Sequence, residues 1–427
     1  MEAYPVEVGG ARKLWWVLGN RHFLALWLAQ AVSQTAQNAL LYLLMVIIET
    51  NTSSSLHMSF LVLSTILPSV IIGMAAGVFV DRWSKRRVLV TTNLLRGAIL
   101  VLFPLFLSHP GLIYVANLLF ATVSQFFAPA EVATIPLVVS RRQLLSANGL
   151  FNLTFTISQA VGFIIVAPLL AKGLGVDTPL PFFILALFFA LAALLVRFLP
   201  RDHRPKKGGG DSRSLWQGVW RELKDGWQLL QGDVSLSLSM VHLTLVSALV
   251  LIMGMLVPGY VSRVLGVRAD DAVYILGPAG LGILAGIALV PRLGERWGKD
   301  RLVHWGLGVM TFSLLSMGSV GLARGIPLGP LVGGAMLFSL VMGGAYAFIN
   351  IPAQTIIQER APVDMRGRIF AIQLVFGNVV AVLPLISLGQ LADFLGVSTV
   401  ILILAVGVFV VAMVTYRWTQ GQKQTET

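Results

Sequence analysis

The stretch that decides the fold is GVFVDRWSKRRVLV, residues 77–90. It places four basic side chains and one acid between two long apolar runs. A near copy, ERWGKDRLV, occupies residues 295–303, which is 214 positions later in a chain of 427 residues. The same charged motif therefore stands at the same point of each half of a largely apolar sequence.

The composition indicates a polytopic membrane protein. Hydrophobic residues make up 56% of the chain and charged residues only 12%, and the mean hydropathy is +0.82. A soluble domain carries about 25% charged residues, whereas a helix that crosses the roughly 30 Å hydrocarbon layer needs about 20 apolar residues. The chain has no cysteine, which excludes disulfides and thiolate metal sites. We expect no metal ion and no cofactor.

Twelve apolar segments result when the chain is cut at polar and Gly/Pro positions. Each must be helical, because a backbone exposed to lipid has to satisfy its own hydrogen bonds. The first segment is too long for the apolar core of a signal peptide and lacks a small-residue cleavage site, so we interpret it as a retained span. The segments are roughly 22–48, 56–80, 88–108, 111–136, 143–171, 178–198, 234–262, 271–291, 302–323, 327–350, 367–390 and 397–416.

Basic residues alternate from one side to the other along these segments. If both termini are cytoplasmic, the inner segments hold 26 of the 31 basic residues, and the outer loops hold only Lys172, Arg263, Arg268 and Arg324. The positive-inside rule thus predicts a multi-pass protein of the cell membrane with both termini in the cytoplasm. It also explains the net charge of +12, for which anionic lipid headgroups, and no nucleic acid, are the expected partner.

The long polar segment 199–233 divides the chain into six spans and six. We predict a cytoplasmic segment 1–21, a six-helix bundle 22–198, a linker 199–233, a second bundle 234–416 and a cytoplasmic tail 417–427. The linker contains LWQGVWRELKDGWQLL, whose apolar residues recur at helical spacing. This pattern predicts an amphipathic helix on the inner headgroup layer or packed on the protein's own inner side.

Internal matches indicate that the two bundles are repeats. AlaProAla at 128–130 reappears as ProAla at 352–353, and LeuAlaLysGlyLeuGlyVal at 170–176 matches LeuAlaAspPheLeuGlyVal at 391–397. Together with the charged motif, three matches occur in the same order at equivalent spans. We therefore expect an all-α polytopic protein of twelve helices in two pseudo-symmetric six-helix bundles, with a substrate cavity between the halves at mid-membrane.

The charged motif resembles the loop signature of the major facilitator superfamily, Gly-x-x-x-Asp-Arg-x-Gly-Arg/Lys-Arg/Lys. The matching residues are Gly77, Asp81, Arg82, Lys85 and Arg86, and Ser84 stands at the second glycine. The second copy keeps Arg296, Gly298 and Lys299, with Glu295 for the aspartate and Pro291 for the first glycine. LWLAQAVSQTAQ in the first segment is similar to the efflux-type branch that includes macrolide and siderophore exporters.

The resemblance implies that the two charged motifs form a gate at the inner face. A carboxylate such as Asp81 can cap the N–H groups of a neighbouring helix and pair with arginines in one conformation and separate in the other. Gly77 is expected to break the helix before it. The alternative is that the basic residues only anchor the loop in the cytoplasm, which does not account for the acid. The predicted gating residues are Gly77, Asp81, Arg82, Lys85, Arg86, Glu295, Arg296 and Lys299.

Uncharged polar side chains recur at helical spacing in the first and fifth segments. Such stripes either line a cavity or bond neighbouring helices to each other. Because the resemblance implies that these spans line the cavity, we predict a substrate-binding role. The candidate residues are Gln30, Gln34, Gln37, Asn38, Gln125, Asn152, Gln159, Asn350, Gln373 and Asn378.

Three ionisable residues within spans are candidates for ion coupling, because charge inside a membrane is costly. Arg96 lies in the third segment, and its expected partner is Glu131 in the fourth; this pair has a structural or a functional role. His242 in the seventh segment titrates near neutrality or is a helix contact. The efflux-type branch often has acids where this chain has Gln37 and Asn93, so the residues give little support to the proton coupling that the resemblance implies.

The function that the sequence favours is secondary active export of a lipophilic or amphipathic small molecule by alternating access, by a monomer. An importer of a nutrient, a lipid flippase and a non-transporting membrane sensor remain alternatives. An enzyme is not expected, because the chain lacks a phosphate-binding Gly-x-x-x-x-Gly-Lys-Ser/Thr loop, a His-Glu-x-x-His motif and cysteine.

Overall fold

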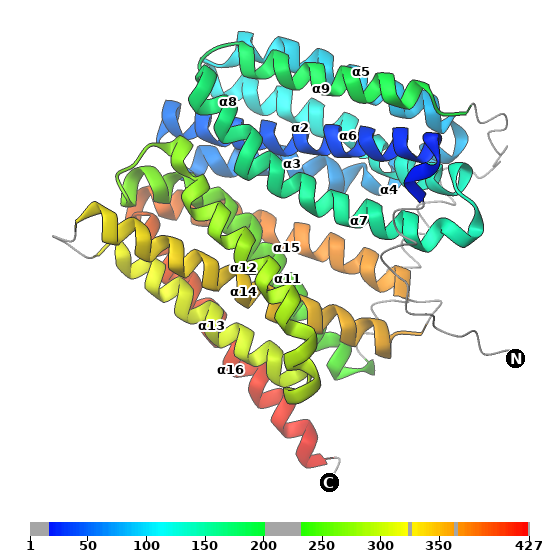
Figure 1. Ribbon diagram of the computed structural model, residues 1–427. Coiled ribbons are helices and arrows are strands. Elements are labelled where there is room, and N and C mark those ends of the chain that lie inside the picture. The colour runs from blue at the N-terminus through cyan, green and yellow to red at the C-terminus, as the bar shows by residue number, and fades with distance from the viewer. Residues whose placement is uncertain (1–16, 201–231, 323–326, 363–365, 426–427) are drawn as a thin grey trace, which may run out of the picture. The chain divides into compact units, whose positions relative to one another are not determined.

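The computed structural model describes residues 17–200, 232–322, 327–362 and 366–425. These residues form helices and no strands (Figure 1). Among them, eleven helical segments are long and apolar enough to cross a membrane, and Ser55–Ile71 is a shorter apolar helix. The predicted all-α fold with twelve spans is confirmed. Most of the predicted linker and of the N-terminal segment lies outside the described residues.

The N-terminal half of the chain holds the first six spans. Its elements are η1 (Val17–Gly19), α2 (Arg21–Thr52), α3 (Ser55–Ile71), α4 (Gly73–Arg82), α5 (Lys85–Leu102), η2 (Phe103–Phe106), α6 (Pro110–Val138), η3 (Arg141–Gln143), α7 (Leu144–Val161), η4 (Gly162–Val166), α8 (Ala167–Leu174) and α9 (Leu180–Arg197). The segment η4 has π-helical hydrogen bonds and joins α7 to α8, so the fifth span is one helix with an irregular middle.

The C-terminal half holds the other six. Its elements are α11 (Val234–Gly259), η5 (Tyr260–Val264), η6 (Ala269–Asp271), α12 (Val273–Trp297), α13 (Lys299–Val320), α14 (Leu328–Arg360), α15 (Arg366–Leu395) and α16 (Val397–Thr425). Helix α11 is capped by Asp233, whose carboxylate accepts hydrogen bonds from the backbone N–H groups of Ser235 and Leu236. This arrangement satisfies N–H groups that the first turn of a helix leaves free.

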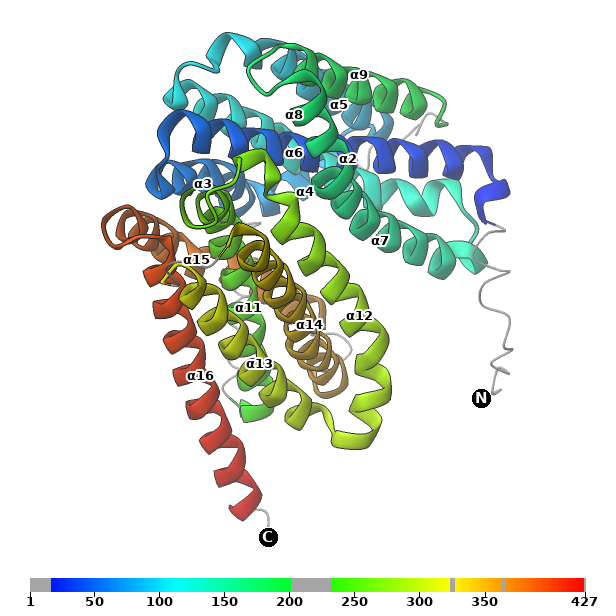
Figure 2. The same cartoon turned by 60° about the vertical axis from the view of Figure 1, so that its left-hand side comes forward.

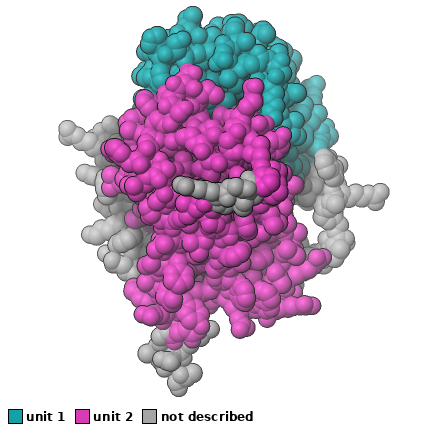
Figure 3. Space-filling model, turned by 90° about the vertical axis from the view of Figure 1, so that its left-hand side faces the viewer, with its two compact units in different colours: residues 1–47, 64–208 teal, residues 48–63, 209–427 magenta. Residues whose placement is uncertain are grey.

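The chain divides into two compact units (Figure 3). Unit 1 comprises Met1–Ile47 and Ser64–Gly208, and unit 2 comprises Ile48–Leu63 and Gly209–Thr427. The end of α2 and the beginning of α3 therefore belong to the unit formed by the C-terminal half. The predicted bundle boundaries stay a prediction. They do not anticipate that residues 48–63, a short helical hairpin of the N-terminal half, group with the C-terminal half in unit 2.

The second span is broken at Ile72 and not at Gly77. Helix α3 contains Pro68 and ends at Ile71, and α4 runs from Gly73 through Gly77 to Arg82. The expectation that Gly77 breaks the helix is wrong. One glycine costs a helix only about 0.5–1 kcal/mol relative to alanine, and an apolar segment has strong reason to keep its backbone hydrogen bonds.

Unit 1 is held together by aromatic side chains between its helices. Helix α5 packs along α9 and α6, and the views in Figures 1 and 2 agree on the α5–α9 pair. Phe103 of η2 stacks on Phe182 of α9 with ring centroids 5.8 Å apart. Phe120 of α6 meets Phe189 of α9 edge to face at 5.6 Å. Stacked and edge-to-face contacts at such separations are the favoured geometries for aromatic pairs.

Unit 2 is built around a close crossing of α12 and α14, its most extensive helix pair. A Cβ atom at Gly282 would overlap the carbonyl oxygen of Leu340, and one at Gly343 would overlap that of Ala279. One turn further, a Cβ at Gly286 would lie 3.1 Å from the carbonyl oxygen of Gly344. Small residues spaced by four allow helix backbones to approach where hydrophobicity gives no driving force.

The substitution Gly282→Ala tests this crossing. We expect it to lower the free energy of unfolding by about 1–3 kcal/mol, because the added methyl group has no space between the two backbones. The thermal unfolding midpoint of the purified protein in detergent measures the effect. The matched control is Gly308→Ala on an exposed face of α13, where nothing lies within 4 Å of the new Cβ and the midpoint should stay or rise. Equal shifts in both variants would contradict the close packing.

Candidate functional site

Among the described residues of unit 1, the most deeply buried charge belongs to Arg96, which lies in the middle of α5. This residue is 1% exposed. The guanidinium carbon lies 4.2 Å from the ring centre of Phe127 on α6 and 4.7 Å from that of Phe189 on α9. Two aromatic faces thus stabilise the cation where water cannot reach it.

The hydrogen-bond partners of Arg96 are amides. Its Nη1 donates to Gln37 Oε1 at 3.3 Å, and its Nη2 donates to Asn93 Oδ1 at 2.7 Å. Asn93 in turn donates to the carbonyl oxygen of Leu89, which fixes its orientation. The two partners are the same two residues that stand where the efflux-type branch often has acids. The guanidinium is therefore bound but not neutralised by them.

Glu131 on α6 is the acid predicted to accompany Arg96. It is 4% exposed, and its Oε1 has no hydrogen-bond partner among the described residues. Arg96 Nε is likewise buried without a partner there. No ion pair joins the two side chains within the described part of the chain, so a buried cation and a buried anion in one unit are each incompletely satisfied. Such groups are costly and are candidates for function.

The polar stripe of α2 divides between helix contacts and the Arg96 site. Gln30 donates to the carbonyl oxygen of Phe151 on α7 at 3.3 Å, and Asn38 donates to that of Gln34 on its own helix. Both Gln30 and Gln34 are buried. The structure brings Gln37 and Arg96 together and places Gln30 in a contact between α2 and α7.

The other predicted cavity residues are spread over both units. Asn152 and Gln159 of α7 are exposed, and Gln125 of α6 is half-buried. In unit 2, Asn350 of α14 and Asn378 of α15 are each half-buried, as is Gln373 of α15. Within each unit these side chains have accessible surface, as cavity-lining residues require, and their role stays a prediction.

The two charged motifs lie at corresponding places and differ in backbone. In the first copy, Gly77, Asp81 and Arg82 belong to α4, and Lys85 and Arg86 form the first turn of α5; the side chain of Asp81 lies outside the described residues. In the second copy, Glu295 and Arg296 end α12, and Lys299, which begins α13, forms an ion pair with Glu359 of α14.

The second copy has a turn that the first copy cannot form. Gly298 has φ +80°, whereas the corresponding Ser84 has φ −64°. Positive φ is open to glycine and strained for serine, so the replacement of the expected glycine in the first motif goes with a different loop. The gating role of both motifs remains a prediction.

His242, the third coupling candidate, belongs to an aromatic cluster in unit 2. It is 4% exposed, its ring centre lies 6.1 Å from that of His304 on α13, and His304 in turn lies 5.4 Å from Tyr416 on α16. The Nε2 atoms of both histidines are buried without hydrogen-bond partners among the described residues. The sequence did not indicate that His242 and His304 meet.

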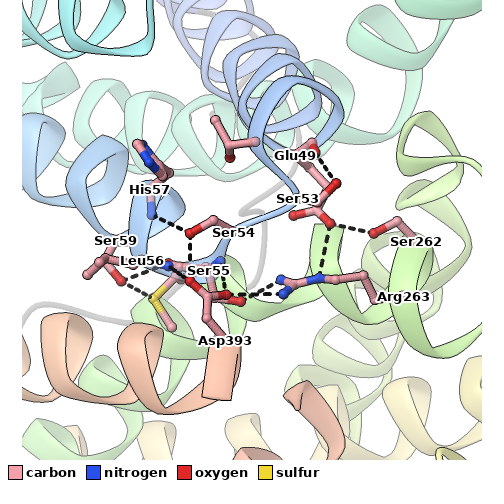
Figure 4. A network of polar contacts seen from close by, with 12 residues as sticks. Glu49, Ser53, Ser54, Ser55, Leu56, His57, Ser59, Ser262, Arg263 and Asp393 are labelled. Atoms are coloured by element: carbon pink, nitrogen blue, oxygen red, sulfur yellow. Dashed lines mark hydrogen bonds and ion pairs between the residues drawn. The ribbon is translucent and has the colours of Figure 1, made fainter. Parts of the chain in front are cut away.

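A second charged site, missed by the sequence analysis, lies in unit 2 (Figure 4). Arg263 of η5 forms ion pairs with two carboxylates: its Nε lies 3.2 Å from Glu49 Oε1 of α2, and its Nη1 donates to Asp393 Oδ1 of α15 at 3.2 Å. We name these three residues the Arg263 network. Two signals were present in the sequence: Arg263 is one of four basic residues in the predicted outer loops, and Glu49 is an acid in the run LMVIIET.

Residues 26–385 match the sequence model of the Major Facilitator Superfamily, which is most of the chain. The chain belongs to the major facilitator superfamily. The predicted superfamily is thereby confirmed, and with it a multi-pass membrane transporter of a small-molecule substrate.

Relatives within the superfamily resemble the chain over most of its length. It is 23% identical to the uncharacterized MFS-type transporter YfiS of Bacillus subtilis, over 85% of this chain and 84% of that one. It is 26% identical to the multidrug efflux pump Tap of Mycobacterium tuberculosis, over 83% of each chain. The crystal structure of the nucleoside transporter NupG, as its D323A mutant, matches with a TM-score of 0.73 and 16% identity, over 93% of this chain and 99% of NupG. The likeness to NupG shows the fold alone.

The incomplete neutralisation of Arg96 leads to a prediction about stability. In Asn93→Asp, the new carboxylate would lie at the present 2.7 Å from the guanidinium, and a hydrogen bond to a charged group is worth about 1.5–3 kcal/mol. We expect the thermal unfolding midpoint in detergent to rise.

The control for this substitution is Gln30→Glu. Gln30 is 4% exposed and donates its amide N–H to the carbonyl oxygen of Phe151, and its Oε1 is buried without a partner among the described residues. Its replacement by a carboxylate should lower the midpoint, because a buried anion without a counter-charge is unfavourable. A fall in both variants would show that Arg96 does not need an anion.

Proposed function

We propose that this superfamily member exports lipophilic or amphipathic small molecules by alternating access, in exchange for protons. The observation that carries the proposal is the Arg96 site in unit 1: a buried guanidinium bound by two amides, with a buried carboxylate that has an unpaired oxygen on the neighbouring helix. The similarity to the efflux pump Tap over most of both chains supports the direction of transport.

The chemistry of the predicted cavity residues supports this substrate class. Apart from Arg96, Glu131 and His242, the candidate residues of both units are glutamines and asparagines. Amides and aromatic rings bind neutral or weakly polar molecules, whereas sugar phosphates or strong anions would call for several arginines. Lipophilic compounds contribute binding energy through apolar area and need few fixed polar contacts.

Glu131 is our candidate for the proton carrier. A carboxylate in a water-free helix interface is stable as an anion only with a counter-charge or hydrogen-bond donors. Ionised Glu131 would attract the guanidinium of Arg96 away from Gln37 and Asn93, and protonated Glu131 would leave it with the amides. The site thus has two arrangements that differ by one proton, which is what coupling of a proton to a conformational change requires.

The remaining predictions fit this function. The charged motifs at 77–90 and 295–303 would act as the inner gate, with both termini in the cytoplasm. A monomer suffices, because each half of the chain supplies one six-helix repeat of the alternating-access design.

Transport in inverted membrane vesicles tests the proposal. With the vesicle interior acidified, wild-type protein should accumulate lipophilic fluorescent dyes, and dissipation of the pH gradient should stop accumulation. Glu131→Gln should reduce gradient-driven uptake at least tenfold, because the amide cannot carry a proton. Uptake that ignores the gradient in the wild type would contradict proton exchange.

The matched control is Asp177→Asn. Asp177 is an exposed acid in a loop of unit 1 and belongs to none of the predicted sites, so its neutralisation should leave gradient-driven uptake within about twofold. Uptake of nucleosides or sugars into right-side-out vesicles, with no movement of dyes in inverted ones, would favour an importer instead.

A further inference from the structure

We infer that the Arg263 network is a latch that holds the outer end of the transporter closed, and that Glu49 is the residue released when it opens. The inference rests on the proposed alternating access and adds residues to it. The network lies at the end of the molecule that the distribution of basic residues predicts to be outer. Its members come from both halves of the sequence and are all within unit 2 (Figure 4).

The latch joins the short hairpin that unit 2 receives from the N-terminal half to helices of the C-terminal half. Arg263 forms an ion pair with Glu49 Oε1 at 3.2 Å and donates hydrogen bonds to Asp393 Oδ1 at 3.2 Å and to Ser55 Oγ at 2.5 Å. Ser262 donates to Glu49 Oε1 at 2.5 Å. One guanidinium therefore binds the end of α2, the beginning of α3 and the end of α15 at once, with the planar fork geometry that arginine provides.

Asp393 caps the N-terminus of α3. Its carboxylate accepts from the backbone N–H groups of Ser55 and Leu56 at 2.7 and 3.1 Å, and from the hydroxyl of Ser54 at 2.6 Å. These N–H groups have no partner within their own helix, and the helix dipole favours an anion there. With the bond from Arg263, four donors satisfy Asp393.

The carboxylate of Glu49 has fewer hydrogen-bond donors than that of Asp393. It is only 2% exposed, its Oε1 accepts a hydrogen bond from Ser262 and is ion-paired with Arg263, and its Oε2 is buried without a hydrogen-bond partner among the described residues. A buried carboxylate loses a large amount of hydration energy and depends on its counter-charge. Glu49 therefore depends on Arg263, whereas Asp393 has the α3 terminus in addition.

The origin of each residue indicates what separates. Arg263 and Asp393 both belong to the C-terminal half, so their ion pair can persist when the hairpin leaves. Glu49, Ser54 and Ser55 belong to the N-terminal half and lose their partners together. This difference gives a reason for two acids around one arginine: Asp393 holds Arg263 in both states, and Glu49 is bound to it only in the closed state.

Apolar and hydroxyl contacts also hold the hairpin of residues 48–63 against α11 and α15. Ser59 of α3 donates to the carbonyl oxygen of Leu385 on α15 at 2.7 Å and contacts Met255 Sδ on α11 at 2.8 Å. A Cβ at Gly389 would overlap Ser59 Oγ. Met255 is 1% exposed. Departure of the hairpin would therefore uncover Met255, which makes this position a reporter of opening.

Cysteine labelling measures the opening directly and requires no substrate. The chain has no cysteine of its own, so Met255→Cys introduces a single thiol, shorter than the side chain it replaces. Asp177→Cys, in an exposed loop at the same predicted end, provides the reference rate. We expect a membrane-impermeant maleimide, applied to intact cells, to react at least tenfold more slowly with the thiol of Met255→Cys than with that of Asp177→Cys.

The latch variants should then raise this rate. Glu49→Gln should raise labelling of the thiol at position 255 at least tenfold, because it weakens the closed state alone. Asp393→Asn should raise it as well, because the neutral amide weakens the bonds to Ser54, Ser55 and Leu56, which exist only in the closed state. Ser262→Ala, which keeps every charge and is a milder change should Glu49→Gln fail to fold, should raise it severalfold.

Arg268→Gln is the matched control. Arg268 is a cation at the same end, 82% exposed and paired with nearby Asp270 at 2.9 Å, so its loss should leave the labelling rate unchanged. An unchanged rate in Glu49→Gln, or an equal rise in Arg268→Gln, would overturn the latch. Failure of dye export with an intact labelling pattern would instead overturn the proposed substrate and leave the latch standing.

Discussion

The need to satisfy every backbone hydrogen bond inside hydrocarbon governs the structure. It forces the apolar segments into helices. The hydrophobic effect does not hold those helices together, because lipid is as apolar as the helices themselves. What remains is close packing and a small number of polar contacts. The crossing of α12 and α14 illustrates packing, since backbone meets backbone at Gly282 and Gly343. Arg96 and Arg263 illustrate the polar contacts.

The two arginines solve the same problem in different ways. Arg96 is nearly inaccessible and is held by aromatic faces and amides, so its charge is tolerated and not cancelled. Arg263 is partly accessible and binds two carboxylates. In the functions that we propose, the Arg96 site responds to one proton on a neighbouring carboxylate, whereas the Arg263 network, with two acids around one cation, responds to the separation of its parts. Coupling and closure would therefore be located at different sites of the transporter.

Much of this could be predicted from the sequence, because the strongest signals are local. Hydropathy located the spans, and the repeated motif indicated a duplicated transporter. The sequence also identified Arg96, since a charge within an apolar run is conspicuous. It failed where tertiary contacts decide. No local sequence pattern shows that the Gln30 amide donates to the carbonyl oxygen of Phe151, that His242 contacts His304, or that the helix continues through Gly77.

The Arg263 network was nevertheless present in the sequence as a conflict between local rules. The matched segments LeuAlaLysGlyLeuGlyVal and LeuAlaAspPheLeuGlyVal both end a helix at a glycine with positive φ, +80° at Gly175 and +86° at Gly396. In the first copy, Lys172 suits the negative end of the helix dipole. In the second, Asp393 stands at the same position, where an acid is unfavourable by about 0.3–1 kcal/mol. An acid retained against its own helix needs a partner elsewhere, and Asp393 has two, the N-terminus of α3 and Arg263. The duplicated halves share their backbone turns and differ in charge, and it is the difference that marks where the hairpin of residues 48–63 is held.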